Sequence, residues 1–169
     1  MLWIRTSLAL ATSALSGACA TAGSSAATIQ APHAPVRDTS ALEVERFFME
    51  GIAKFNRREL DPFLLQFDET IRMFAVSSWL RGRAEVRQRF VDTFRQFPEA
   101  RMEITNLRAR SETPNVVTVE FEFHTYPRGT GPAYHGVGTG VYVRRAEGWR
   151  EVLEHETVTR RDPGLATPR

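Results

Sequence analysis

Hydrophobic and polar positions follow two different periodicities along this chain. In the first half of the folded part, apolar side chains recur every three or four residues, which is the spacing of an amphipathic helix. Ser40 and Glu43 form a capping-box pattern ahead of the first such stretch, and Asp61-Pro62 is a helix-opening pair. The pattern predicts three helices: about 41–56, a short one beginning at Asp61-Pro62, and 83–96.

Beyond Pro98 the apolar residues recur at every second position, as they do in a half-buried strand. A tight turn at Glu147-Gly148 separates the last two of these stretches. The pattern predicts four long strands and a small earlier hairpin: 102–110, 116–126, 134–145 and 149–159, with 71–74 and 78–81. This order predicts an α+β fold in which helices pack on a curved antiparallel sheet.

The alternation also predicts which side chains face the core. In the strand over 116–126 the odd positions are apolar and the even ones are threonine or glutamate, and the apolar valines of the next strand are again odd. If odd positions pair with odd, a single inner face collects polar side chains from the last two strands. The predicted inward polar residues are His135, Thr139, Glu151, His155 and Thr157, and Trp149 and Leu153 accompany them.

The N-terminal region is expected to lie outside the fold. Arg5 and a short apolar stretch resemble a signal peptide over 1–20, and the sole cysteine, Cys19, stands where either signal peptidase cleavage or bacterial lipidation is expected. Residues 21–39 are rich in Ala, Ser, Thr and Pro and predict a disordered tether with a reach of roughly 25 Å. The prediction is therefore an exported protein that is periplasmic or anchored by lipid, with a folded domain over 40–160 and a frayed tail over 161–169.

Composition excludes little beyond this. The chain has 169 residues and a formal net charge of +2, so no strong field draws it toward nucleic acid. The arginines of the third predicted helix alternate with its buried positions, which indicates a solvated face. No phosphate loop, nucleophile elbow or zinc-ligand spacing is present, and no cofactor is expected.

Three short motifs carry a resemblance to a known family. They are Phe67-Asp68-Glu69-Thr70 before the hairpin, Gly82-Arg83-Ala84-Glu85-Val86 at the third helix, and Gly148-Trp149 followed by His155-Glu156-Thr157 in the last strand. Their order resembles the SnoaL-like branch of the nuclear transport factor 2-like superfamily over about 41–159. The resemblance implies a cone-shaped sheet that three N-terminal helices close on one side, with a small-molecule pocket between them.

The superfamily includes isomerases, dehydratases, cyclases, epoxide hydrolases and non-catalytic members, so the resemblance does not fix a reaction. Ketosteroid isomerases carry a carboxylate near the end of the first hairpin strand, where this chain has Phe74 or Ala75. That activity is therefore not expected. Relatives often pair through the sheet, which implies a homodimer.

His155 is the first candidate for a catalytic proton carrier, and Glu151 is the second. The competing interpretations are a structural histidine bonded to Thr139 or Thr157, and a glutamate at the rim of the cone paired with an arginine. Four strand residues, about 13 Å, separate the two candidates, so no single metal ion is expected to bind both. Trp79, His135, Thr139 and Thr157 are the candidate ligand contacts, with core packing as the alternative for the aromatic residue.

Three functions remain open at this point. The leading one is a domain that binds a small, partly apolar molecule in its cone. The alternatives are a cofactor-free isomerase, dehydratase or cyclase that uses His155 and Glu151 as acid–base groups, and a non-catalytic dimerisation module.

Overall fold

The computed structural model describes residues 39–75, 77–126 and 131–164. The expected signal peptide, the possible lipidation site at Cys19 and nearly all of the expected tether lie outside these residues. None of the helices in the described ranges combines the length and the hydropathy that a bilayer crossing requires.

The three helices lie where the apolar periodicity predicts them, but each begins one or two residues earlier than predicted. They are α1 (Thr39–Asn56), α2 (Leu60–Leu64) and α3 (Gly82–Gln96). Ser40 lies inside α1, where its hydroxyl donates to the carbonyl of Pro114, and Glu59 rather than Asp61 is the N-cap residue of α2. The capping-box prediction is wrong because Glu43 has stronger donors in the sheet, the Trp149 indole at 3.0 Å and the Arg144 guanidinium at 2.6 Å.

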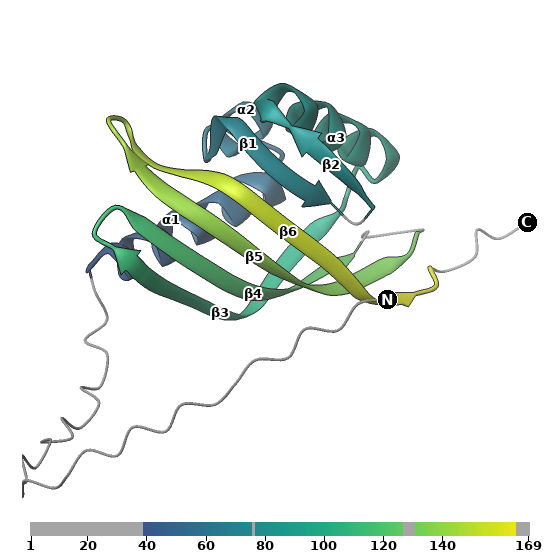
Figure 1. The fold of residues 1–169 in the computed structure, drawn as a ribbon. Coiled ribbons are helices and arrows are strands. Elements are labelled where there is room, and N and C mark those ends of the chain that lie inside the picture. The colour runs from purple at the N-terminus through teal and green to yellow at the C-terminus, as the bar shows by residue number, and fades with distance from the viewer. Residues whose placement is uncertain (1–38, 76, 127–130, 165–169) are drawn as a thin grey trace, which may run out of the picture. The chain divides into compact units, whose positions relative to one another are not determined.

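Six strands form one sheet in the order β2-β1-β6-β5-β4-β3 (Figure 1). They are β1 (Phe67–Ala75), β2 (Ser78–Arg81), β3 (Arg101–Thr113), β4 (Val116–Tyr126), β5 (Ala133–Arg145) and β6 (Gly148–Asp162). Neighbours are antiparallel except β1 and β6, which run parallel, so the expectation of a wholly antiparallel sheet is wrong at this pair. Parallel neighbours need a long connection, and here nearly the whole domain connects them. The last strand also continues to Asp162, past the expected end of the fold.

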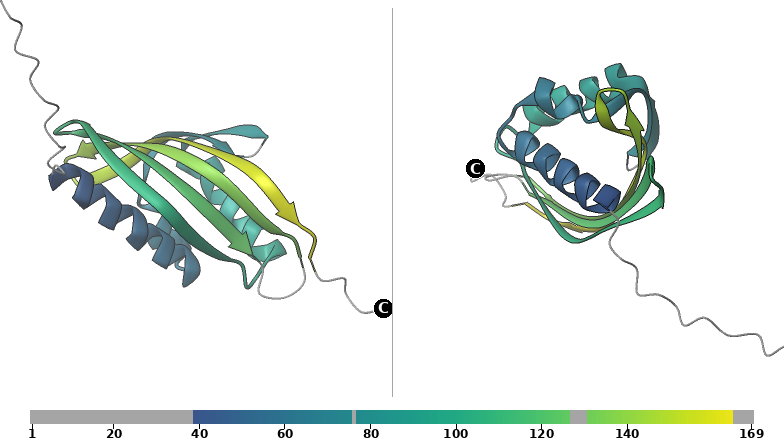
Figure 2. Two further views of the ribbon diagram at one scale, coloured as in Figure 1. Left: turned by 90° about the horizontal axis from the view of Figure 1, so that it is seen from below. Right: turned by 90° about the vertical axis from the view of Figure 1, so that its left-hand side faces the viewer.

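The sheet is strongly curved and curls around α1 (Figure 2). Val44, Phe48 and Ile52 of α1 pack against the inner side chains of β4 and β5. A second cluster, centred on Phe55 and Phe90, lies between the helices and β1. The concave side of the sheet is therefore the core side, and the convex side faces outward.

The predicted register of β4 is confirmed, because its odd residues Val117 to Phe123 are buried. The prediction for β5 is wrong. Its even positions face inward, so Gly138 lies under the ring of Phe121, and an added Cβ there would stand 2.2 Å from that ring. The glycines make room for the phenylalanines of β4, and the odd valines consequently face outward, with Val137 46% exposed.

A β-bulge at Val152 shifts the register of β6, and a second shift follows at Thr159. Before Val152, Glu151 pairs with Tyr142, and after it Leu153 pairs with Val141, so one extra residue is inserted. Trp149 and Glu151 therefore face inward as predicted, whereas Leu153, His155 and Thr157 face outward, against the prediction. In the second half of the strand the inner positions are taken by the next even residues, Glu154, Glu156 and Val158.

Candidate functional site: three glutamates inside the cone

The concave face of β6 carries three buried carboxyl groups. Glu151, Glu154 and Glu156 are 2%, 8% and 7% exposed, and all three line one small interior space beside Phe48 and Phe90. The bulge at Val152 brings them to one face, because in an unbroken strand residues of odd and even number point to opposite sides.

Burial changes the protonation of two of these groups. It raises the pKa of Glu151 to about 8, and the negative charge of Glu156 adds to this effect, while the Tyr142 hydroxyl and the Glu154 carboxyl beside it act in the opposite direction. Burial, together with the charges of Glu151 and Glu156, also raises the pKa of Glu154 well above its ordinary value. Burial thus favours the protonated form of both groups, and a protonated carboxyl can donate a hydrogen bond.

The third carboxyl, that of Glu156, forms an ion pair with an arginine. A guanidinium nitrogen of Arg89, on α3, stands 3.0 Å from the Glu156 carboxylate, and the guanidinium also lies over the ring of Phe90 with 5.6 Å to its centroid. Among the described residues, the interior thus holds three carboxyls and one guanidinium. With Glu151 and Glu154 protonated, these four groups together carry no net charge.

An open cavity of about 240 Å³ lies between α3 and the inner face of β4, β5 and β6. Arg89 and Glu156 supply its ion pair, and the other walls are mainly aromatic and apolar. These are Phe55, Phe90, Phe97, Ala100, Met102, Phe123, Pro132, Tyr134 and Val158, with Thr93 and Thr125. We call it the mouth cavity.

A much smaller space of about 30 Å³ shares Phe90, Met102 and Glu156 with the mouth cavity. Glu151, Glu154 and Gln66 also line this inner chamber. Close to it, Glu151 Oε1 and the Tyr142 hydroxyl are buried with no hydrogen-bond partner of normal geometry among the described residues. A buried polar atom without a hydrogen bond lowers the stability of the fold. The chamber therefore favours a ligand atom that can form a hydrogen bond there.

Apart from Glu151, the residues expected to form the site lie on the opposite side of the sheet. His155, Thr139 and Trp79 line an open hollow of about 610 Å³ on the convex face, together with Phe74 and Leu153. The His155 imidazole stands edge-on to the Phe74 ring at 5.2 Å, and the Thr157 hydroxyl is 3.5 Å from its Nε2. His155 and Glu151 therefore point to different faces and do not meet at one reacting atom.

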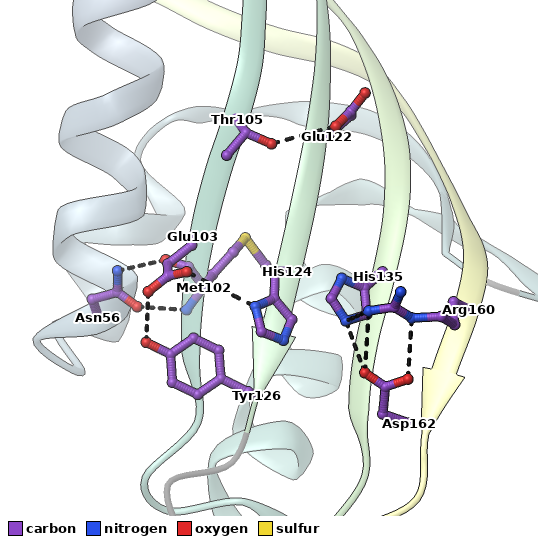
Figure 3. Close-up of polar contacts among 10 residues, drawn as sticks. All are labelled: Asn56, Met102, Glu103, Thr105, Glu122, His124, Tyr126, His135, Arg160 and Asp162. Atoms are coloured by element: carbon purple, nitrogen blue, oxygen red, sulfur yellow. Dashed lines mark hydrogen bonds and ion pairs between the residues drawn. The ribbon is translucent and has the colours of Figure 1, made fainter.

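His135 also departs from its expected place on the inner face. Its ring stacks on His124 across the β4–β5 pair, with centroids 4.1 Å apart, and Asp162 and Arg160 flank its Nε2 (Figure 3). Glu103 stands on the other side of the pair, 3.8 Å from His124. This is a polar cluster of the outer surface, remote in its contacts from the mouth cavity. Within the described ranges, no three His, Cys, Asp or Glu side chains are grouped as ligands for one metal ion.

Comparison with known proteins agrees with this architecture. The SnoaL-like domain family matches residues 44–160. The chain belongs to this family. A search among curated proteins gave no match.

Solved structures similar to this SnoaL-like domain share its fold at low sequence identity. A nuclear transport factor 2-like protein of unknown function from Pseudomonas putida is 12% identical, with a TM-score of 0.64 over 76% of this chain and 96% of that one. A putative scytalone dehydratase from Novosphingobium aromaticivorans is 11% identical, with a TM-score of 0.63 over 75% and 93%. A putative calcium/calmodulin-dependent protein kinase type II association domain from Thiobacillus denitrificans is 23% identical, with a TM-score of 0.54 over 64% and 88%.

The interior of this SnoaL-like domain offers acid–base groups that sequence reasoning missed. Glu154 and Glu156 were assigned outward by strict alternation, and Arg89 was counted among the solvated arginines of its helix. A search for carboxyls on both faces of the last strand would have found the glutamates. The guanidinium could not be assigned in the same way, because its partner is 67 residues away.

Proposed function

We propose that the domain binds a small, partly apolar molecule in the mouth cavity. The observation that supports this is the open aromatic cavity itself, because a core with no guest normally fills such a space with its own side chains. The three helices close one side of the cone, and the Arg89–Glu156 pair provides polar contacts at the wall.

Filling the cavity tests this proposal. Ala100 is buried and lines the mouth, so Ala100→Phe places a ring in the space where the ligand is expected. Small molecules that copurify with the wild-type domain should be extracted and identified by mass spectrometry, then titrated into both proteins. The matched control is Ala84→Phe, which adds the same ring at an exposed position of α3. Equal ligand recovery from all three proteins would refute the proposal.

Acid–base catalysis on the bound molecule is the second candidate, and the raised pKa values of Glu151 and Glu154 favour it. We propose that Glu156, which lines the mouth, exchanges protons with the ligand in an isomerase, dehydratase or cyclase reaction, with Glu154 behind it as a proton reservoir. This replaces the pair of His155 and Glu151. The test is deuterium incorporation into the extracted ligand in D₂O, which should be lost in Glu156→Gln and kept in His155→Ala.

Pairing of two copies through the convex face is a separate proposal about assembly. Trp79, Val137 and Leu153 expose large apolar side chains there, and the similar association domain suggests a protein whose role is assembly. Leu153→Glu should convert a dimer into a monomer in sedimentation experiments, whereas Glu147→Gln should not. A wild-type protein that sediments as a monomer would refute dimerisation, and the proposal of ligand binding would be unaffected.

A further inference from the structure

The interior of the cone has two parts of very different size. The mouth cavity, at about 240 Å³, has the volume of roughly eight water molecules at about 30 Å³ each. The inner chamber, at about 30 Å³, has room for roughly one. Because Phe90, Met102 and Glu156 line both spaces, a molecule seated in the mouth is adjacent to the chamber, which has room for about one of its atoms.

The two parts also differ in chemistry. Both linings are mainly apolar, and Glu156 belongs to both, but the chamber also has the carboxyls of Glu151 and Glu154 and the amide of Gln66, which the mouth lacks. The groups that face these carboxyls from neighbouring elements are Arg89 on α3 and Tyr142 on β5. A ligand that fits both parts has an apolar body and one small polar end.

We infer that the cone takes an uncharged molecule with an apolar body and a single terminal oxygen, a ketone, aldehyde or alcohol, whose oxygen enters the inner chamber and accepts a hydrogen bond from the carboxylic acid of Glu154 or Glu151. This inference rests on the proposed ligand-binding function and adds the class of ligand to it.

The charges of the groups around the chamber favour an uncharged ligand. An anion in the chamber would lie against the Glu156 carboxylate, and the one guanidinium that the described residues place at the wall is already paired with that carboxylate. A cation would require Glu151 or Glu154 to give up its proton or remain unpaired in a buried space. A neutral oxygen needs no such change, since it accepts from a group that is already a donor.

The experiment uses matched ligands on the wild-type chain. Each set shares one apolar body and differs at one end: a ketone, the alkene with CH₂ in place of oxygen, and the ammonium in place of the ketone. Three bodies are used, 4-tert-butylcyclohexyl, decalinyl and linear octyl, and affinities are measured by calorimetry. The ketone of at least one set should bind about tenfold or more tightly than its alkene, because the alkene leaves the buried donor unsatisfied.

Two variants then locate the donor. Glu154→Gln keeps a donor and should retain the preference for ketone over alkene, whereas Glu154→Leu should reduce the ratio toward one while the alkene still binds. The same pair of substitutions at Glu151 distinguishes the two acids. If neither leucine variant folds, the comparison of ketone, alkene and ammonium on the wild type still tests whether a buried donor binds the ligand oxygen.

The possible outcomes distinguish a failure of this inference from a failure of the proposed ligand binding. Equal binding of ketone and alkene, or tightest binding of the ammonium, would overturn the inference and leave ligand binding intact. Failure of every member of all three sets to bind at millimolar concentration would overturn both. A preference for ketone that persists in both leucine variants would place the oxygen elsewhere and also overturn the inference.

Discussion

Replacing Glu151 with glutamine should make the fold less sensitive to rising pH. The side chain is buried, and its pKa rises from 4.5 to about 8 on folding, mainly because burial disfavours the charged form. Between these two values the unfolded chain has lost the proton and the folded chain still holds it. The contribution of Glu151 to stability is therefore greatest below about pH 4.5 and falls as pH rises toward 8, after which it is constant.

The size of the effect follows from the shift. One pKa unit corresponds to about 1.4 kcal/mol, so the wild type should lose on the order of 5 kcal/mol across this window through this group alone. Glu151→Gln removes the titration.

Urea unfolding at pH 5, 6, 7 and 8 measures the difference. The free energy of unfolding of the wild type, relative to the variant, should decline by about 1.4 kcal/mol for each pH unit. Glu147→Gln is the matched control, because the same substitution is made at an exposed turn residue of the neighbouring hairpin. Parallel pH profiles for wild type and Glu151→Gln would refute a buried carboxylic acid at this position.

Three further predictions concern other parts of the chain. A backbone hydrogen bond and further donors lower the pKa of Asp68 to about 2, so Asp68→Asn should cost roughly 1–2 kcal/mol at pH 7, and the difference should vanish as pH falls toward 2 in urea unfolding. Gly138→Ala should lower the unfolding free energy by about 1–3 kcal/mol because its methyl group meets the Phe121 ring, whereas Thr139→Val on the outer face should change it by less than about 0.5 kcal/mol. Export with lipidation at Cys19 predicts that globomycin blocks processing of the wild type and that Cys19→Ser removes the lipid in mass spectrometry.

The sequence predicts the elements of this fold well because its periodicities are strong. The helix over 41–56 and the strand over 116–126 have one face that is almost wholly apolar, so packing leaves little choice. The parallel pairing of β1 with β6 has no such signal, since nothing in a strand's own sequence identifies a neighbour some eighty residues away.

The candidate site was harder to predict, because in β5 and β6 the alternation of apolar and polar side chains does not show which face is buried. In the middle of β5 the inward positions are the glycines Gly136, Gly138 and Gly140, which have no side chain to mark a core face, so the alternation of the outward valines resembles that of a buried set. In β6 the bulge at Val152 reverses the alternation within one strand. Glu151 precedes the bulge and its placement was predicted, whereas His155 follows it and its placement was not.

The bulge at Val152 has a consequence for how this interior can change over time. If the segment after Glu151 slid by one residue, so that Val152 paired with Val141, alternation would be unbroken as far as Val158, and His155 and Thr157 would face into the cone while Glu154 and Glu156 faced out. Such a slip of the pairing would exchange an acidic interior for an imidazole and a hydroxyl, whereas deletion of Val152 would keep the present pairs and leave the carboxyls inside. Two chains of this fold with nearly identical last strands can therefore present unrelated chemistry to a ligand.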